Sequence, residues 1–103
     1  MQPGKALVKF TKSAQSDLLE AWLFIAEENL SAADRLLDQI NGEVATLFLQ
    51  PFMGRARPEL AKGLRSWPTS TSYILFYLVD GGEITVLRVL HHARDIHQFA
   101  FDE

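Results

Sequence analysis

Residues 72–80, with the sequence SYILFYLVD, carry apolar side chains at both odd and even positions. A strand with this pattern is apolar on both faces, so it belongs in the middle of a sheet that is covered at least partly on both sides. The pair Gly81-Gly82 follows directly and suits the two-residue turn of a β-hairpin. Residues 83–92 are then predicted to return as the last strand, and residues 64–68 are predicted as the strand that precedes this hairpin.

The N-terminal half is predicted to contain two amphipathic helices. Between residues 14 and 29 the apolar side chains recur at helical spacing and, at about 100° per residue, fall in one broad stripe. Thr11 and Ser13 are the candidate N-caps of this first helix, because a side-chain oxygen at that position accepts a free backbone N–H.

The second helix is predicted to start near Ser31, whose hydroxyl can accept the backbone N–H of Asp34. Its apolar stripe runs to Gln50, and Pro51 stops it. Gly42 is interpreted as an interior glycine that costs about 1 kcal/mol relative to alanine; the alternative is that the helix kinks or ends there. Because the connection between the two helices is so short, they are expected to form an antiparallel hairpin.

A short alternating run at residues 6–10 predicts a first strand, and residues 93–101 are predicted as a short helix or tail. Residues 51–63, which contain two prolines and two glycines, are predicted to be a structured loop. The order strand, helix, helix, three strands, tail predicts an α+β two-layer sandwich in which the second strand runs antiparallel to the first. With 103 residues, the chain is expected to form one domain over residues 1–103.

Charge is unevenly distributed along the chain, which has 10 Lys and Arg against 13 Asp and Glu, a formal net charge of -3. Acids dominate residues 17–50, where Arg35 is the single base, and bases dominate residues 51–68, where Glu59 is the single acid. A nucleic-acid-binding domain usually has a pI above about 9, whereas the pI here is about 5.5. Sequence-specific nucleic-acid binding by this chain alone is therefore not expected.

Several classes of protein are disfavoured by what the sequence lacks. Cysteine is absent, which excludes disulfides, thiol nucleophiles and thiolate metal sites. No stretch reaches the roughly 18 to 20 apolar residues that cross a bilayer, and residues 1–5 lack the pattern of a secretory signal. We therefore expect a cytoplasmic protein without membrane association.

Side chains suited to metal binding or catalysis are also poorly placed. His91 and His92 are expected to point to opposite sides of the last strand, and His97 lies in the tail, so no metal site is predicted. The serines lack the glycine spacing of a nucleophile turn, the acids lie mainly on helix faces, and no glycine-rich phosphate loop is present. The sequence therefore predicts no cofactor, no metal and no catalytic residue.

Arginine is the remaining candidate for function, because a planar guanidinium binds phosphates and carboxylates bidentately. The candidate cluster consists of Arg55, Arg57, Arg65, Arg88 and Arg94. Two interpretations remain open. The arginines form an internal ion pair that fixes the loop to the sheet, or they form a surface that binds an acidic partner or nucleic acid.

Arg88 is the most unusual of the five, because a partly buried arginine normally has a partner. Its strand face is predicted to be shared with the apolar residues Ile84, Val86 and Leu90. Asp95 and Glu59 are the candidate partners.

Some apolar residues are not accounted for by the helix stripes. Phe24 and Leu49 each lie off the stripe of their own helix. Together with Trp67, Tyr73 and Tyr77 they are predicted to form an apolar docking surface.

Several segments resemble a known family. They are PFMGRARPEL at residues 51–60, GLRSWP at 63–68, YILFY at 73–77, VLHHARDI at 89–96 and AADRLL at 32–37. In this order they resemble the ParE branch of the RelE/ParE toxins, which are toxin components of bacterial type II toxin–antitoxin modules. The resemblance covers nearly the whole chain.

The resemblance implies a toxin that inhibits DNA gyrase without intrinsic catalysis. It also implies a ParD-like antitoxin that binds the toxin directly in a hetero-oligomer. Disordered antitoxin segments dock in apolar grooves or at sheet edges. The antitoxin-binding residues are therefore predicted to be Phe24, Leu49, Trp67 and Tyr77.

Two alternatives remain open. RelE-type relatives cleave mRNA on the ribosome with a tyrosine–arginine pair in the central strand and a tyrosine near the C-terminus, but this chain has Tyr73-Ile74 and no tyrosine at residues 97–99. In that interpretation Arg94 is a retained base and His91 or His97 shuttles protons. The second alternative is a toxin-fold protein that is not toxic and only binds its antitoxin.

Overall fold

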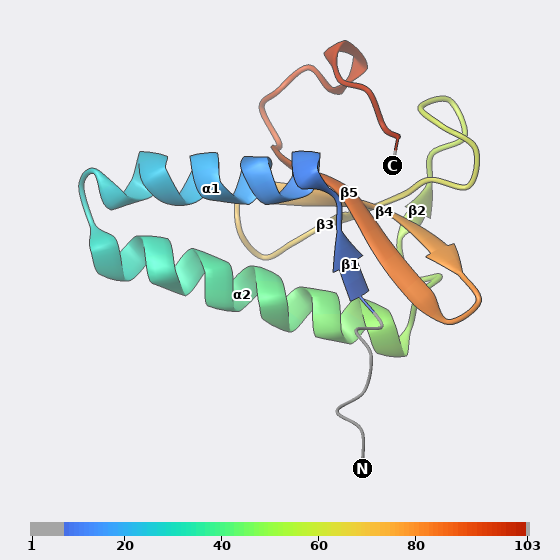
Figure 1. The fold of residues 1–103 in the computed structure, drawn as a ribbon, viewed down its shortest axis with the longest axis horizontal. Coiled ribbons are helices and arrows are strands. Elements are labelled where there is room, and N and C mark those ends of the chain that lie inside the picture. The colour runs from blue at the N-terminus through green and yellow to red at the C-terminus, as the bar shows by residue number, and fades with distance from the viewer. Residues whose placement is uncertain (1–7, 103) are drawn as a thin grey trace.

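The computed structural model describes residues 8–102. Its elements are β1 (Val8–Phe10), α1 (Lys12–Ala26), α2 (Leu30–Leu49), β2 (Arg55–Ala56), β3 (Arg65–Pro68), β4 (Tyr73–Asp80), β5 (Glu83–His91) and the 3-10 helix η1 (Ile96–Gln98). The predicted α+β class, the two helices, the β-hairpin at Gly81-Gly82 and the short helix in the tail are all present (Figure 1). Ala6 and Leu7 of the predicted first strand lie outside the described residues.

The strands form one five-stranded sheet in the order β1-β5-β4-β3-β2. β1 pairs in parallel with β5, and every other pairing is antiparallel. Since β3 is antiparallel to β4 and β4 is antiparallel to β5, β3 runs in the same direction as β1. The prediction that the strand at residues 64–68 opposes the first strand is therefore wrong. The reason is β2, which lies within the predicted loop and adds one more reversal of the chain.

The helical hairpin is fixed at both helix starts by capping side chains. The Thr11 hydroxyl accepts the Ala14 N–H at 3.1 Å and donates to the Leu87 carbonyl at 2.9 Å, so it joins α1 to β5 and confirms Thr11 as the cap. At α2 the prediction of Ser31 is wrong, because the helix begins at Leu30 and the Asn29 side chain accepts the N–H of Ala32 at 2.9 Å.

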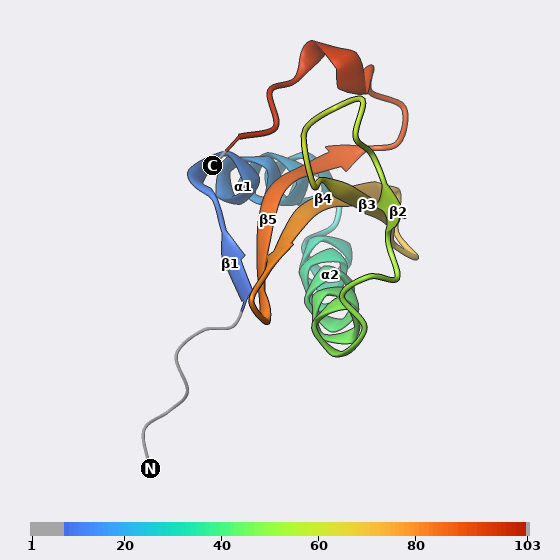
Figure 2. The same cartoon turned by 90° about the vertical axis from the view of Figure 1, so that its right-hand side faces the viewer.

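The sheet is buried on both faces, as the apolar pattern of residues 72–80 predicts. The helices cover one face, in a cluster built on Leu36, Ile40, Leu47, Leu75, Tyr77, Ile84, Val86 and Val89. The C-terminal segment covers the other face, where Ile96, Phe99 and Phe101 pack on Leu64, Phe76, Leu87 and Leu90. Figure 2 shows this segment and α2 on opposite sides of the sheet.

A β-bulge in β5 changes which side chains face each layer. Phe76 is opposite Arg88 but Tyr77 is opposite Val86, so Leu87 is the extra residue. Because the period-two alternation shifts there by one residue, Val86 lies with the helices and Leu90 lies on the other face. Arg88 lies opposite Phe76 and so shares a face with Leu90, as predicted, but the prediction that it also shares this face with Ile84 and Val86 is wrong.

Candidate functional site

The main cleft of the described chain has a volume of about 620 Å³ and lies between α1, the ends of β4 and β5, and the C-terminal segment. Its charged or titratable lining consists of Lys12, Asp17, Glu20, Tyr73, Arg88, His91 and Arg94, and its exposed or half-buried aromatic lining includes Phe24 and Phe99. The cleft therefore offers both signs of charge beside aromatic surface, which suits a peptide better than a small apolar ligand.

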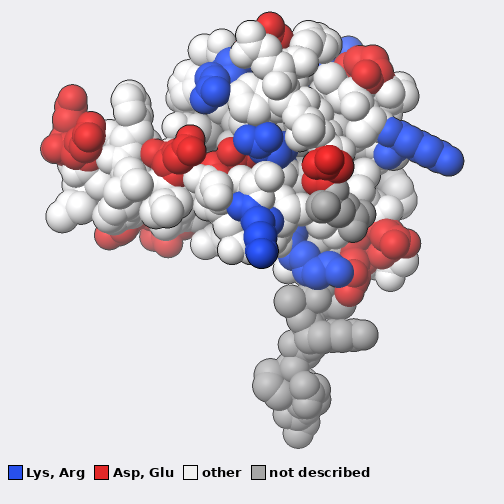
Figure 3. Space-filling view, turned by 45° about the horizontal axis from the view of Figure 1, so that its top comes forward, with Lys and Arg blue, Asp and Glu red and all other residues white. Residues whose placement is uncertain are grey.

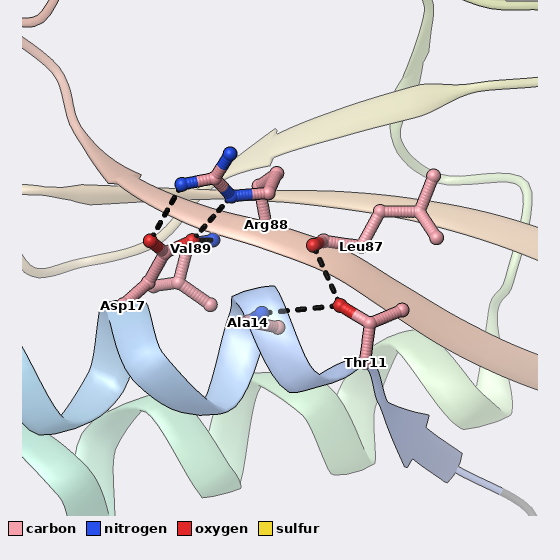
Figure 4. Close-up of polar contacts among 6 residues, drawn as sticks. All are labelled: Thr11, Ala14, Asp17, Leu87, Arg88 and Val89. Carbon is pink, nitrogen blue, oxygen red and sulfur yellow. Dashed lines mark hydrogen bonds and ion pairs between the residues drawn. The ribbon is translucent and has the colours of Figure 1, made fainter. Parts of the chain in front are cut away.

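One wall of the cleft is held by a bidentate ion pair between α1 and β5 (Figure 4). The Asp17 carboxylate accepts from Arg88 Nε and Nη2, both at 2.8 Å, and also accepts the Val89 N–H at 2.9 Å. The Arg88 side chain is 16% exposed and that of Asp17 is 9% exposed. The hydrogen bonds to Asp17 raise the pKa of Arg88 above its usual value, although burial acts in the opposite direction.

Asp17 was not predicted as the partner of Arg88, and the predicted candidates Asp95 and Glu59 are wrong. A signal for Asp17 exists in the sequence. Ala14, Asp17 and Ala21 lie on one side of α1, and the two alanines are almost completely buried. Such short side chains let the helix approach β5 closely enough for a carboxylate to reach its backbone.

The C-terminal segment closes over this ion pair through Phe99. The guanidinium carbons of Arg88 and Arg94 each lie 4.9 Å from the centre of the Phe99 ring. Each such cation–π contact contributes about 0.5–1 kcal/mol at an exposed site. Arg88 and Arg94, two of the five predicted arginines, are therefore brought together at the cleft.

The other three arginines lie around β2 and β3, and none of them lines the cleft. Arg57 bonds to Glu59 at 2.8 Å and to the Ser66 hydroxyl at 3.2 Å. Arg65 donates to the carbonyl oxygen of Gly54 at 2.7 Å, and Arg55 is exposed on β2. The five arginines thus form two separate groups, and the single predicted cluster does not exist.

The surface charge is uneven. In Figure 3 the projecting end of the helical hairpin shows acidic side chains, whereas basic and acidic side chains are mixed over the body of the molecule. The cleft lies where α1 meets that body.

The predicted antitoxin-binding residues do not form one surface. Phe24 is 74% exposed and lines the cleft, whereas Leu49 is 77% exposed and lies at the last residue of α2. Because α1 and α2 run antiparallel, these two residues lie near opposite ends of the hairpin (Figure 1). Trp67 is half-buried, and its indole N–H donates to the Glu43 carboxylate at 2.8 Å, so it holds β3 against α2.

Tyr77 is fully buried, and its prediction as an antitoxin contact is therefore wrong. Its hydroxyl donates to the Pro51 carbonyl at 2.8 Å and accepts the Gly54 N–H at 2.9 Å. Burial raises the pKa of this hydroxyl, against the opposing effect of the Gly54 hydrogen bond. A Cβ on Gly54 would collide with the same hydroxyl. Tyr77 is a structural anchor for the loop that precedes β2.

The family described as "ParE toxin of type II toxin-antitoxin system, parDE" matches residues 8–96. The chain belongs to the ParE toxin family. It is a toxin-type member of a ParDE toxin–antitoxin system, and such a system implies an antitoxin as its partner.

Relatives agree with this assignment. Toxin ParE1 of Mycobacterium tuberculosis, from the strains CDC 1551 / Oshkosh and ATCC 25618 / H37Rv, is 33% identical over 86 residues, which are 82% of this chain and 87% of that protein. The solved structure of the chromosomal ParDE TA system from P. aeruginosa is similar in fold, with a TM-score of 0.68 at 23% identity over 82% of this chain and 92% of that chain.

Histidines and acids of this ParE-family chain do not gather into a metal site within residues 8–102. β5 ends at His91, so His92 lies outside the strand, and the two rings stack at 4.6 Å instead of pointing apart as predicted. His91 Nδ1 accepts the Ala93 N–H at 3.1 Å. None of the described helices is long and apolar enough to cross a membrane.

Proposed function

We propose that this ParE-family toxin inhibits DNA gyrase in the cytoplasm and is neutralised by direct binding of a ParD-like antitoxin. The observation that carries the proposal is the match to the ParE toxin family over residues 8–96. Inhibition of this kind needs a binding surface and no catalytic group on the toxin itself.

The environment of Ile74 supports gyrase inhibition over cleavage of mRNA. At this position RelE-type relatives carry an arginine, whereas Ile74 packs on the buried cluster beneath the C-terminal segment. RelE-type relatives carry a tyrosine in the region that corresponds to residues 97–99. In this chain Phe99 occupies that region, and its ring, which has no hydroxyl, packs against the guanidinium groups of Arg88 and Arg94. An acidic chain is also poorly suited to ribosomal RNA, since such binding depends on neutralising phosphates.

The cleft supports the antitoxin part of the proposal. Its rim carries Phe24, a large apolar side chain that is mostly exposed, and its floor is formed by small or buried residues such as Ala21 and Val89. An amphipathic helix can place an apolar anchor against such a surface and satisfy the charges at its margins. Leu49 and the region of Trp67 lie elsewhere, so an antitoxin that contacts them as well must wrap around the hairpin.

The test is to produce the full chain without any antitoxin and to assay it in two reactions. We expect inhibition of supercoiling by purified gyrase and no cleavage of mRNA on translating ribosomes. Addition of a ParD-like antitoxin should restore supercoiling. Ribosome-dependent cleavage that is lost in Arg94→Ala would establish the RelE-like alternative. A chain that binds the antitoxin but acts in neither assay would establish the non-toxic alternative.

A further inference from the structure

The outer edge of β2 is the feature of the molecule that the proposed function leaves unexplained. β2 is the terminal strand of the sheet and pairs with β3 alone among the described residues (Figure 2). Arg55 is opposite Ser66 and Ala56 is opposite Arg65, and the ladder continues with a hydrogen bond from Arg57 N–H to the Leu64 carbonyl at 2.8 Å. Hydrogen-bonded pairs alternate in an antiparallel ladder, so the N–H and C=O of Ala56 point away from β3.

This edge is held in place before any partner arrives. The Tyr77 hydroxyl bridges Pro51 and Gly54, and the Arg65 guanidinium donates to the Gly54 carbonyl. Together these contacts fix the turn that leads into β2. Tyr77 holds the turn from β4, and Arg65 holds it from β3. A partner strand therefore meets a preformed edge and does not have to order it, which lowers the cost of binding.

The side chains around the edge are aromatic and basic. Phe52 is 67% exposed, and the Arg65 guanidinium carbon lies 4.9 Å from the centre of its ring. Arg65 hydrogen-bonds to carbonyl oxygens, and Arg57 is the arginine of this group that pairs with a carboxylate in the described chain. The positive charges of Arg55 and Arg65 therefore remain available to a partner.

We propose that the edge of β2 is a docking site for an extended, acidic segment of a partner protein, which adds as a strand beside Ala56. The two outward backbone groups of Ala56 supply the pairing. Arg55 selects acidic side chains on one face of the added strand, and Phe52, with Arg65 stacked on its ring, supplies an apolar contact on the other face. A second copy of the chain is disfavoured, because antiparallel pairing of two β2 edges through Ala56 would place Arg55 of each copy opposite Arg57 of the other. Nucleic acid is disfavoured because a phosphate can accept from the outward Ala56 N–H but leaves the outward Ala56 carbonyl without a donor.

The experiment uses the isotope-labelled full chain and a synthetic peptide of alternating glutamate and valine. We expect the largest NMR shifts at residues 55–57 and slower exchange of the Ala56 amide. A peptide with N-methylated backbone and a peptide with lysine in place of glutamate should each bind at least about tenfold more weakly, because they lose the pairing or the charge match.

Two variants and a matched control test the same site from the protein side. Ala56→Pro removes the outward N–H, and proline is tolerated in edge strands. Arg55→Glu reverses the charge of the side chain. Each variant should lower the affinity for the acidic peptide at least about tenfold. Arg35→Glu makes the same charge change on an exposed residue of α2 and should leave the affinity unchanged. If Ala56→Pro does not fold, the N-methylated peptide decides the question.

Equal binding of the N-methylated peptide would overturn the proposal, as would shifts that map to α1 and α2. Absence of binding by the acidic peptide, or binding of a single-stranded oligonucleotide at residues 55–57 in its place, would also overturn it. None of these outcomes depends on gyrase inhibition, so the two proposals fail or succeed separately.

Discussion

The Asp17 carboxylate on α1 and the Arg88 guanidinium on β5, 71 residues apart in the sequence, form a two-point ion pair at the wall of the cleft. Arg88 follows directly after Leu87, the extra residue of the β-bulge. A bulge re-aims the side chains beside it, and here it lets Arg88 reach α1 while its guanidinium also lies against Phe99. One pair of residues therefore ties together the helical hairpin, the sheet and the C-terminal segment.

Removal of Arg88 is expected to be strongly destabilising. Arg88→Met leaves the Asp17 carboxylate nearly buried with only the Val89 N–H as a partner, and loss of one member of a buried pair costs about 3 kcal/mol. Urea denaturation measures this loss, and Glu28→Gln, at an exposed acid outside the cleft, is the control. The double variant Asp17→Asn with Arg88→Met should be more stable than the sum of the single losses predicts. Strict additivity would show that the pair has no energetic coupling.

Protonation of Glu43 is expected to cause part of the loss of folding stability at low pH. Burial disfavours its ionised form, but the hydrogen bonds from the Trp67 indole and from Ser70 outweigh burial and lower the pKa of Glu43 below its ordinary value of 4.5. A carboxyl whose pKa is lower in the folded chain contributes stability above its unfolded pKa, and this contribution is lost as the pH falls through the folded pKa. Glu43→Gln should therefore flatten the acid side of the stability profile, measured by Trp fluorescence.

Glu28→Gln is the control for this experiment, because Glu28 is exposed at the end of the hairpin. It should leave the acid side of the profile as steep as in the original chain. If Glu43→Gln and Glu28→Gln give the same profile, the contacts of Glu43 with Trp67 and Ser70 do not contribute to the pH dependence.

Removal of the Tyr77 hydroxyl should destabilise the folded chain more than removal of an ordinary tyrosine hydroxyl. Tyr77→Phe leaves the buried Gly54 N–H and the Pro51 carbonyl without their shared partner, and each unsatisfied group of this kind costs about 1–3 kcal/mol. Thermal unfolding measures the change. Tyr73→Phe is the matched control, because Tyr73 packs edge-on against His91 and no hydrogen bond of its hydroxyl is observed in the described chain. Equal melting temperatures for the two variants would contradict the anchoring role.

Local sequence signals predict part of this fold, and long-range contacts determine the rest. The helices, β4 and β5 were predictable because periodicity and the Gly81-Gly82 turn are local properties. The bulge at Leu87 was not, since register depends on the partner strand, and without it the facing of Arg88 could not be derived. The same limit applies to the buried position of Tyr77. An alternating apolar strand does not reveal which aromatic residue reaches a loop 26 residues earlier.

Phe24 remains the sharpest probe of antitoxin binding. It lines the cleft, is largely exposed and supports no buried cluster, so Phe24→Ala should fold normally. Truncation of an aromatic anchor costs about 2 kcal/mol or more of binding, which is at least about tenfold in affinity for a ParD-like antitoxin. Glu28→Ala, on the exposed acidic end of the same hairpin, should change the affinity little. Trp67→Ala is less informative, because it also removes the hydrogen bond to Glu43. Calorimetry of the purified toxin with the antitoxin measures both variants, and an unchanged affinity for folded Phe24→Ala would exclude the cleft rim as an antitoxin contact.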